Sequence, residues 1–246
     1  MRARTDPDKG VRTLDDATGR TTEQPISRLW RRPLLCLALI GAVGLVTVVL
    51  GFALDYSTAQ AWFSENHLVE NLTLLAYFAA VGLLLLWPVA PGRFRYHTAF
   101  VVALGAMREL DLHNAFTSES FMKISYYVDG DDPAWARAIS GVILLGLLAI
   151  LIRYLAYVRP LIAALKRGRP DAYSALAAIL LLPFTKTLDS VSRMIHEHVG
   201  YDVSDDIRHW FYLFEEALEL AIPLLIILAM AQYSQQHAGA PGHRRV

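Results

Sequence analysis

The chain has 246 residues, of which 54% are hydrophobic and 19% are charged, and its acidic and basic residues balance to a formal net charge of zero. This composition is too apolar for an ordinary soluble domain, and it lacks the basic excess typical of nucleic-acid binding. Because Cys36 is the only cysteine, an internal disulfide and a metal site built from several cysteines are both excluded. The expected partner is therefore the lipid bilayer, and no nucleic-acid partner is expected.

Six apolar runs follow one another along the chain. The first, Leu34–Leu54, contains no charged residue and is long enough as a helix to cross about 30 Å of hydrocarbon. The runs are continuous and do not alternate, which favours helices over a β-barrel. The other five are Glu70–Val89, Tyr96–Phe116, Ile139–Tyr157, Tyr173–His196 and His209–Tyr233. We therefore expect an all-α polytopic membrane protein with a bundle of six transmembrane helices.

The basic residues are distributed unequally between the two sides of this arrangement. Segments on the side of the N-terminus hold most of them, whereas the opposite loops hold only Lys123, Arg137 and Arg208 together with many acids. By the positive-inside rule, both termini are expected in the cytoplasm, and a bacterial inner (plasma) membrane suits such short loops. The expected organisation is a disordered cytoplasmic tail, a six-helix membrane domain and a short cytoplasmic tail, at residues 1–27, 28–233 and 234–246.

The third run, Tyr96–Phe116, contains a cluster of charged residues. Its uninterrupted apolar part, Thr98–Met107, has about ten residues, half of the length that a membrane crossing needs. Arg108 and Glu109 are therefore expected within the outer half of the membrane. Glu109 and His113 are four residues apart and share a helix face, a spacing that suits a metal ion or a proton relay.

The fifth and sixth runs carry further charged residues at the same expected depth. In the fifth, the charged residues follow the spacing i, i+3, i+7 and i+10 and so form one stripe, at Lys186, Asp189, Arg193 and His196. In the sixth, three glutamates have no basic residue near them, at Glu215, Glu216 and Glu219. Ionisable groups are costly inside a bilayer, so three clusters at one depth predict a functional site.

Acidic residues outnumber permanent cations in this layer. The acids are Glu70, Glu109, Asp111, Asp189, Glu215, Glu216 and Glu219, and the cations are Arg108, Lys186 and Arg193. Uncompensated carboxylates are too costly at low dielectric constant, so either several carry protons, or the layer is hydrated, or a divalent cation is bound. For the last case, the candidate ligands of a zinc or manganese ion are Glu109, His113, Asp189 and His196.

A purely structural interpretation stands beside the functional one. The pairs Arg108–Asp111 and Asp189–Arg193 are spaced for ion pairs that would hold helices in register. The three glutamates are the hardest to explain in this way, because nothing near them in the sequence neutralises them. Lys186 is the next hardest, because its position is too deep for the ammonium group to reach the membrane surface easily.

Three functional hypotheses follow. The first is an inner-membrane enzyme, a metal-assisted intramembrane hydrolase or transferase that acts on a lipid-like or small-molecule substrate from the outer leaflet. The second is a small proton- or cation-coupled transporter, with Pro183 and Pro223 marking broken helices. The third is a structural membrane subunit whose charges dock a partner. The catalytic candidates under the first hypothesis are Glu215, Glu216, Glu219, Arg108, Lys186 and Arg193.

The enzyme is favoured over the transporter because the polar layer is one-sided. The inner half of every run is almost purely apolar and offers no polar route to the cytoplasm. In the enzyme, the glutamates would act as ligands or as the general base, and the cations would hold an anionic head group or stabilise an oxyanion.

Overall fold

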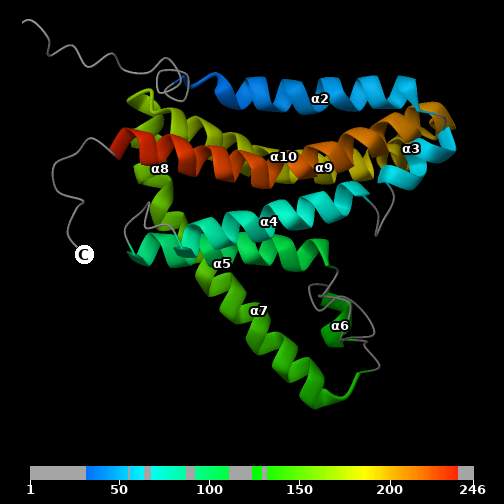
Figure 1. The fold of residues 1–246 in the computed structure, drawn as a ribbon. Coiled ribbons are helices and arrows are strands. Elements are labelled where there is room, and N and C mark those ends of the chain that lie inside the picture. Colours follow the sequence, from blue (N-terminus) through cyan, green and yellow to red (C-terminus); the bar gives the residue numbers. More distant parts are fainter. Residues whose placement is uncertain are drawn as a thin grey trace, which may run out of the picture.

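The computed structural model describes residues 32–54, 56–63, 68–86, 92–110, 124–128 and 132–237, and within them every regular element is a helix (Figure 1). The helices are α2 (Leu35–Ala53), α3 (Tyr56–Phe63), α4 (Leu68–Leu86), α5 (Gly92–Glu109), α6 (Ile124–Val128), α7 (Ala134–Tyr154), η2 (Leu155–Tyr157), α8 (Val158–Lys166), α9 (Pro170–Val199) and α10 (Asp205–His237). The expected tail at residues 1–27 lies outside the described residues. The last helix continues past residue 234, where the second tail was expected to begin, as far as His237.

Each of the six predicted runs overlaps one long helix, namely α2, α4, α5, α7, α9 or α10. In the described part of the chain, four stretches are long and apolar enough to cross a membrane: Leu35–Ala53, Ser57–Leu86, Ala134–Lys166 and Pro170–Val191. The prediction of an all-helical protein is therefore confirmed, and these four stretches indicate a membrane protein. The two long helices that are not among the four, α5 and α10, both carry charged clusters.

The last helix, α10, lies at the centre of the bundle. It packs against α9, α4 and α2, while α5 packs against α4 (Figure 1). This helix has no polar side chain at residues 220–231, and a segment that is apolar all round is suited to such burial. Its buried apolar residues are Leu213, Ala217, Leu218, Ala221, Ile222, Leu225 and Leu228. Five of them, Leu218, Ala221, Ile222, Leu225 and Leu228, form one core with Tyr77, Ala80 and Leu84 of α4, Ala99, Val102 and Ala106 of α5, and Ala178 and Leu181 of α9. The other two, Leu213 and Ala217, form a second cluster with Phe63 and Val69.

A glycine allows α2 to approach α10 closely. A Cβ atom at Gly51 would lie only 2.5 Å from Cη2 of Trp210, which is closer than real Cβ contacts come. Small residues at helix interfaces let backbones approach in this way within membranes. The indole of Trp210 also packs at 5.1 Å, centroid to centroid, against the ring of Phe52 in the same part of α2.

Residues 200–204 join α9 to α10 at one end of the bundle, which we call the loop end. The C-cap of α9 is Gly200, whose φ of +67° is left-handed and whose N–H donates to the carbonyl of His196. At about 1.5 Å per residue, the 30 residues of α9 and the 33 of α10 are longer than the hydrocarbon layer is thick. The start of α2 and the end of α10 lie together at the opposite end (Figure 1).

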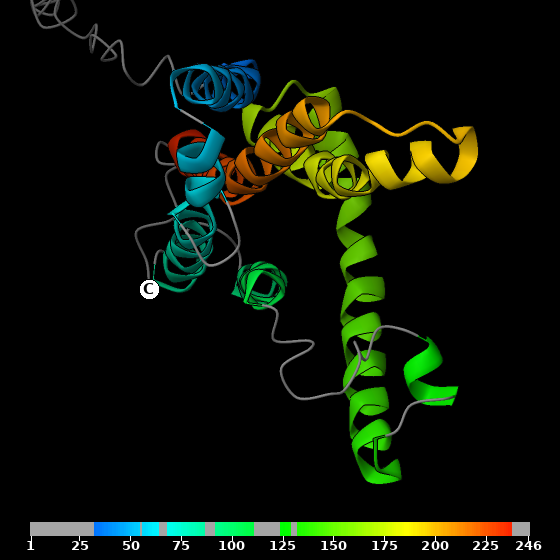
Figure 2. The same cartoon turned by 90° about the vertical axis from the view of Figure 1, so that its right-hand side faces the viewer.

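The helix α7 lies apart from the bundle. Figure 2 shows it running away from the other long helices, with α6 beside its far end. There the hydroxyl groups of Tyr126 and Ser140 are 3.3 Å apart. At its other end, the rings of Tyr154 and Tyr157 pack against Phe94 of α5. In the part of the chain that the structure describes, the long helices therefore do not all lie side by side, and the ring contacts between α7 and α5 lie near one end of α7.

Candidate functional site

The charged residues predicted from the sequence meet around the loop-end half of α10. Glu219 is buried, whereas Glu215 and Glu216 are partly buried. Because α10 is central, its glutamates have charged neighbours from α5 on one side and from α9 on the other. The site therefore consists of two connected parts, one towards each of these helices.

On the side of α5, Arg108 forms an ion pair with Glu219 of α10, and its Nη2 donates a hydrogen bond to Oε1 of that carboxylate. The side chain of Glu219 is 9% exposed and that of Arg108 is 40% exposed. The cation that the sequence around Glu219 lacks is thus supplied by another helix. The alternative partner of Arg108, Asp111, lies outside the described residues.

Tyr77 of α4 belongs to this part of the site. Its side chain is buried, and a Cβ atom at Gly105 of α5 would lie 2.7 Å from its Cε1. The lack of a side chain at Gly105 therefore makes room for the ring. The phenol lies within electrostatic reach of Arg108, Glu109 and Glu219.

Further carboxylates surround the ion pair. Glu109 lies within electrostatic reach of Arg108, Glu219 and Glu70. The charged groups of the described structure that lie within electrostatic reach of Glu216 are acids, at Glu219, Glu215, Glu109 and Glu70. This side of α10 thus retains the excess of acidic over basic groups that the sequence indicates.

On the side of α9, the ion pair that forms is Lys186 with Asp189, on the exposed face of the helix. The structure thereby corrects the expected pairing of Asp189 with Arg193. Nη2 of Arg193 instead lies 3.4 Å from Oγ of Ser190. Glu215 of α10 lies within electrostatic reach of both Asp189 and Lys186. Two predicted clusters, one on each helix, are therefore adjacent.

A cavity of about 440 Å³ lies at this junction, between the last turns of α9, residues 200–204 and the first half of α10. Such a volume is typical of small-molecule sites. At its rim, Nδ1 of His196 is 2.7 Å from Oδ1 of Asp202. The lining residues are Leu188, Asp189, Arg193, His196, Asp202, Val203, Arg208, Phe211, Tyr212 and Glu215. Asp202, Arg208 and Phe211 were not predicted, because only the turn at Gly200 brings them back towards α9.

The four predicted metal ligands are divided between the two parts. Glu109 lies on the side of α5, Asp189 and His196 line the cavity, and His113 lies outside the described residues. Among the residues that the structure describes, no three His, Cys, Asp or Glu side chains are grouped so that they could hold a metal ion. A zinc or manganese site therefore stays a prediction.

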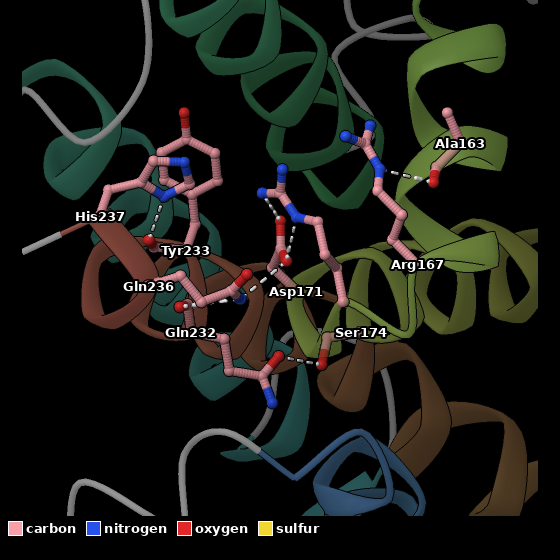
Figure 3. A network of polar contacts seen from close by, with 9 residues as sticks. Ala163, Arg167, Asp171, Ser174, Gln232, Tyr233, Gln236 and His237 are labelled. Carbon is pink, nitrogen blue, oxygen red and sulfur yellow. Dashed lines mark hydrogen bonds and ion pairs between the residues drawn. The ribbon is translucent and has the colours of Figure 1, made fainter. Parts of the chain in front are cut away.

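A second polar network lies at the opposite end of α9 and α10 (Figure 3). Oγ of Ser174 donates to Oε1 of Gln232 at 2.7 Å, and both side chains are fully buried. Nε2 of Gln236 donates to Asp171 at 2.9 Å, and Arg169 donates two hydrogen bonds to the same carboxylate. These residues lie at the ends of the fifth and sixth predicted runs or just beyond them, so an almost purely apolar inner half stays a prediction, but the network itself was not predicted from the sequence. The spacing of Asp171 and Ser174, three residues apart at the start of a helix, is the signal that could have revealed it.

Comparison with protein-family models, with curated proteins and with solved structures found no match to this chain.

Proposed function

We propose that the chain is an integral protein of the bacterial inner membrane with six transmembrane helices and both termini in the cytoplasm. The support is the overlap of six apolar runs with six long helices, together with the basic residues on one side. The start of α2 and the end of α10 lie at the same end of the bundle, as an even number of crossings requires. In this orientation the loop end faces the periplasm.

We further propose that the loop-end site is the active site of an intramembrane hydrolase or transferase that acts on a lipid-like substrate. The observation that carries this proposal is the position of Glu215 and Glu216. Both are partly buried on the central helix, and neither accepts a hydrogen bond from any residue that the structure describes. Glu215 also lines the cavity, and a carboxylate without a donor beside a cavity is available to act as a general base.

The other charged residues would have distinct roles in this enzyme. Arg108 is held by Glu219 and would stabilise negative charge that develops in the transition state. Arg193 and Lys186 would hold an anionic group of the substrate at the entrance. A zinc or manganese ion stays part of the proposal, with Glu109, His113, Asp189 and His196 as its candidate ligands.

A proton- or cation-coupled transporter is the second candidate. The excess of carboxylates favours it, and the buried pair Ser174–Gln232 places polar groups in the other half of the membrane domain. Between the two polar regions, however, α9 and α10 contribute apolar residues to the shared core, including Leu181, Ile222 and Leu225. A closed apolar middle supports a one-sided enzyme over alternating access.

Two measurements test the enzyme. Elemental analysis of the detergent-purified protein, beside the Glu216→Gln/Glu219→Gln variant, should find a stoichiometric metal in the wild type that the variant lacks. The protein should also release or transfer a head group from lipids in proteoliposomes, and the variant should not. No metal after reconstitution with added ions would exclude the metal-assisted mechanism. No turnover of any lipid class, with proton- or cation-driven uptake instead, would favour the transporter.

A further inference from the structure

The lining of the cavity between α9 and α10 includes an arginine that has no acidic partner among the described residues. The hydrogen bond of Arg193 within this part of the chain is with the hydroxyl of Ser190, at 3.4 Å. A second arginine of the lining, Arg208, has only weak contacts: Nη2 lies 3.4 Å from the carbonyl of Val203 and Nη1 lies 3.7 Å from Asp205. Guanidinium groups are the preferred protein partners of phosphate, which they bind through paired N–H donors. The arginines of the lining are therefore suited to bind a phosphate group.

Acidic residues line the same cavity. Glu215 of α10 lines the same cavity and accepts no hydrogen bond from the part of the chain that the structure describes. Asp189 of α9 lies near it and is paired with Lys186 on the exposed side of the helix. Although Arg193 and Glu215 line one cavity, they form no ion pair with each other within the described structure. The lining thus holds a basic group and an acidic group that are not paired with each other in the described structure.

Basic and acidic groups in one lining restrict the charges that a ligand can carry. A simple anion would be attracted by the arginines but repelled by Glu215, and a simple cation would experience the reverse. A ligand that carries a phosphate and an ammonium group together would match both kinds of charge. Apolar side chains complete the lining, at Leu188, Val203 and Phe211, and suit the uncharged part of such a molecule.

We propose that this cavity binds a phosphate ester that carries a primary ammonium group, the phosphoethanolamine chemistry, with the phosphate on Arg193 and Arg208 and the ammonium on Glu215. The inference rests on the proposed lipid-directed function and names its substrate class. A primary ammonium donates hydrogen bonds to a carboxylate, whereas a trimethylammonium group cannot. An ethanolamine head group is therefore preferred over a choline head group and over an anionic glycerol head group.

The test is lipid retention by the purified full-length protein, measured by native mass spectrometry. The protein is incubated with equal amounts of phosphatidylethanolamine, phosphatidylcholine and phosphatidylglycerol that have the same acyl chains. The wild type should retain the ethanolamine lipid about tenfold better than the other two, as expected for one charge-assisted hydrogen-bonded pair. Arg193→Gln should weaken its retention about tenfold, and Glu215→Gln should abolish the preference over phosphatidylglycerol.

Matched variants control for the loss of charge. Glu197 is exposed on α9 outside the cavity, and Arg153 is exposed near the end of α7. Glu197→Gln and Arg153→Gln should therefore retain all three lipids as the wild type does. Equal retention of the three lipids by the wild type, or unchanged retention by both cavity variants, would overturn the proposal.

A soluble competitor identifies the source of the head group. Glycerophosphoethanolamine that displaces the lipid only at far higher concentration supports a membrane lipid, and displacement at equal concentration supports a soluble ester of the same chemistry. A failure of the proposed head-group binding can be distinguished from a failure of the enzyme hypothesis, because lipid binding is measured without turnover. Selective binding without turnover would exclude only the enzyme, and turnover without head-group preference would exclude only this cavity ligand.

Discussion

Arg108 and Glu219 are separated by 111 residues in the chain and form one ion pair between α5 and α10. The pair joins two of the three charged clusters, and it fixes the carboxylate that lies deepest in the site. In a membrane, where isolated charges are costly, such a pair also restricts how the two helices can be placed relative to each other.

Arg108→Gln should destabilise the protein, because it leaves the buried carboxylate of Glu219 without a cation. Glu219 is buried but Arg108 is partly exposed, so the cost lies between those of exposed and fully buried pairs, on the order of 2–3 kcal/mol. The double variant Arg108→Gln/Glu219→Gln should recover most of this loss. The measurement is thermal unfolding in detergent, and a double variant as unstable as the single one would show that the pair does not couple the helices.

Gly105→Ala should destabilise the contact between α4 and α5. The added Cβ would lie 2.7 Å from Tyr77 Cε1, and overpacking of this kind costs about 1–3 kcal/mol. Gly82→Ala is the matched control, because a Cβ at that position meets no atom within 4 Å. The measurement is the thermal unfolding midpoint of each variant in detergent. If Gly105→Ala unfolds no earlier than Gly82→Ala, the close approach of Tyr77 is not a tight contact.

Ser174→Ala should destabilise the far end of the bundle more than Gln232→Leu. Nε2 of Gln232 already has no partner among the described residues, so losing the hydroxyl of Ser174 leaves the whole buried amide unpaired, at a cost of about 1–3 kcal/mol. Gln232→Leu removes both the oxygen and the nitrogen of the amide, so that only the hydroxyl of Ser174 is left without its partner. Unfolding midpoints of the two variants, compared with the wild type, measure the difference. The reverse order of stability would indicate that Gln232 has a polar partner.

Glu216→Gln and Glu215→Gln should lower lipid turnover by about 100-fold or more if either carboxylate is the general base. Glu197→Gln supplies the control, since this residue has the same charge on an exposed face of α9 outside the cavity. Initial rates in proteoliposomes, with folding checked by unfolding midpoints, separate loss of chemistry from loss of structure. Equal rates for all three variants would remove the acid–base role from this site.

The orientation can be tested by labelling single cysteines in a Cys36→Ala background. Asp202→Cys at the loop end should react with a membrane-impermeant maleimide on intact spheroplasts. Arg167→Cys at the opposite end should react only after lysis. Both positions are exposed in the structure, so a lack of reaction would not reflect burial. The inverse pattern would place the loop end, and with it the candidate site, in the cytoplasm.

The sequence was sufficient to predict helices but not their neighbours. Long apolar runs specify helices because each run must satisfy its own backbone in lipid, and the predicted run Leu34–Leu54 matches α2 (Leu35–Ala53) almost residue for residue. Spacing along one helix proposes only partners on that helix, so it could not identify Glu219 as the partner of Arg108. Spacing also allows two partners for Asp189, because side chains three and four residues apart both meet on a helix. We expected Arg193, four residues away, but the structure pairs Asp189 with Lys186, three residues away.

The cavity was beyond sequence reasoning for a related reason. Its walls come from two helices and from the segment that reverses the chain after Gly200, so no single run contains its pattern. The central position of α10 was equally hidden, because an apolar run bearing three glutamates resembles a helix at the edge of a polar site.

The central position of α10 has a consequence for biosynthesis. This helix leaves the ribosome after α2, α4, α5 and α9, yet it is the one against which α2, α4 and α9 pack. The earlier helices must therefore reside in the bilayer without their common neighbour, and Arg108 must wait for its carboxylate partner. A chain interrupted before α10 would be left with an unpaired cation and an unfilled interface, features by which a membrane protease distinguishes incomplete chains from finished ones.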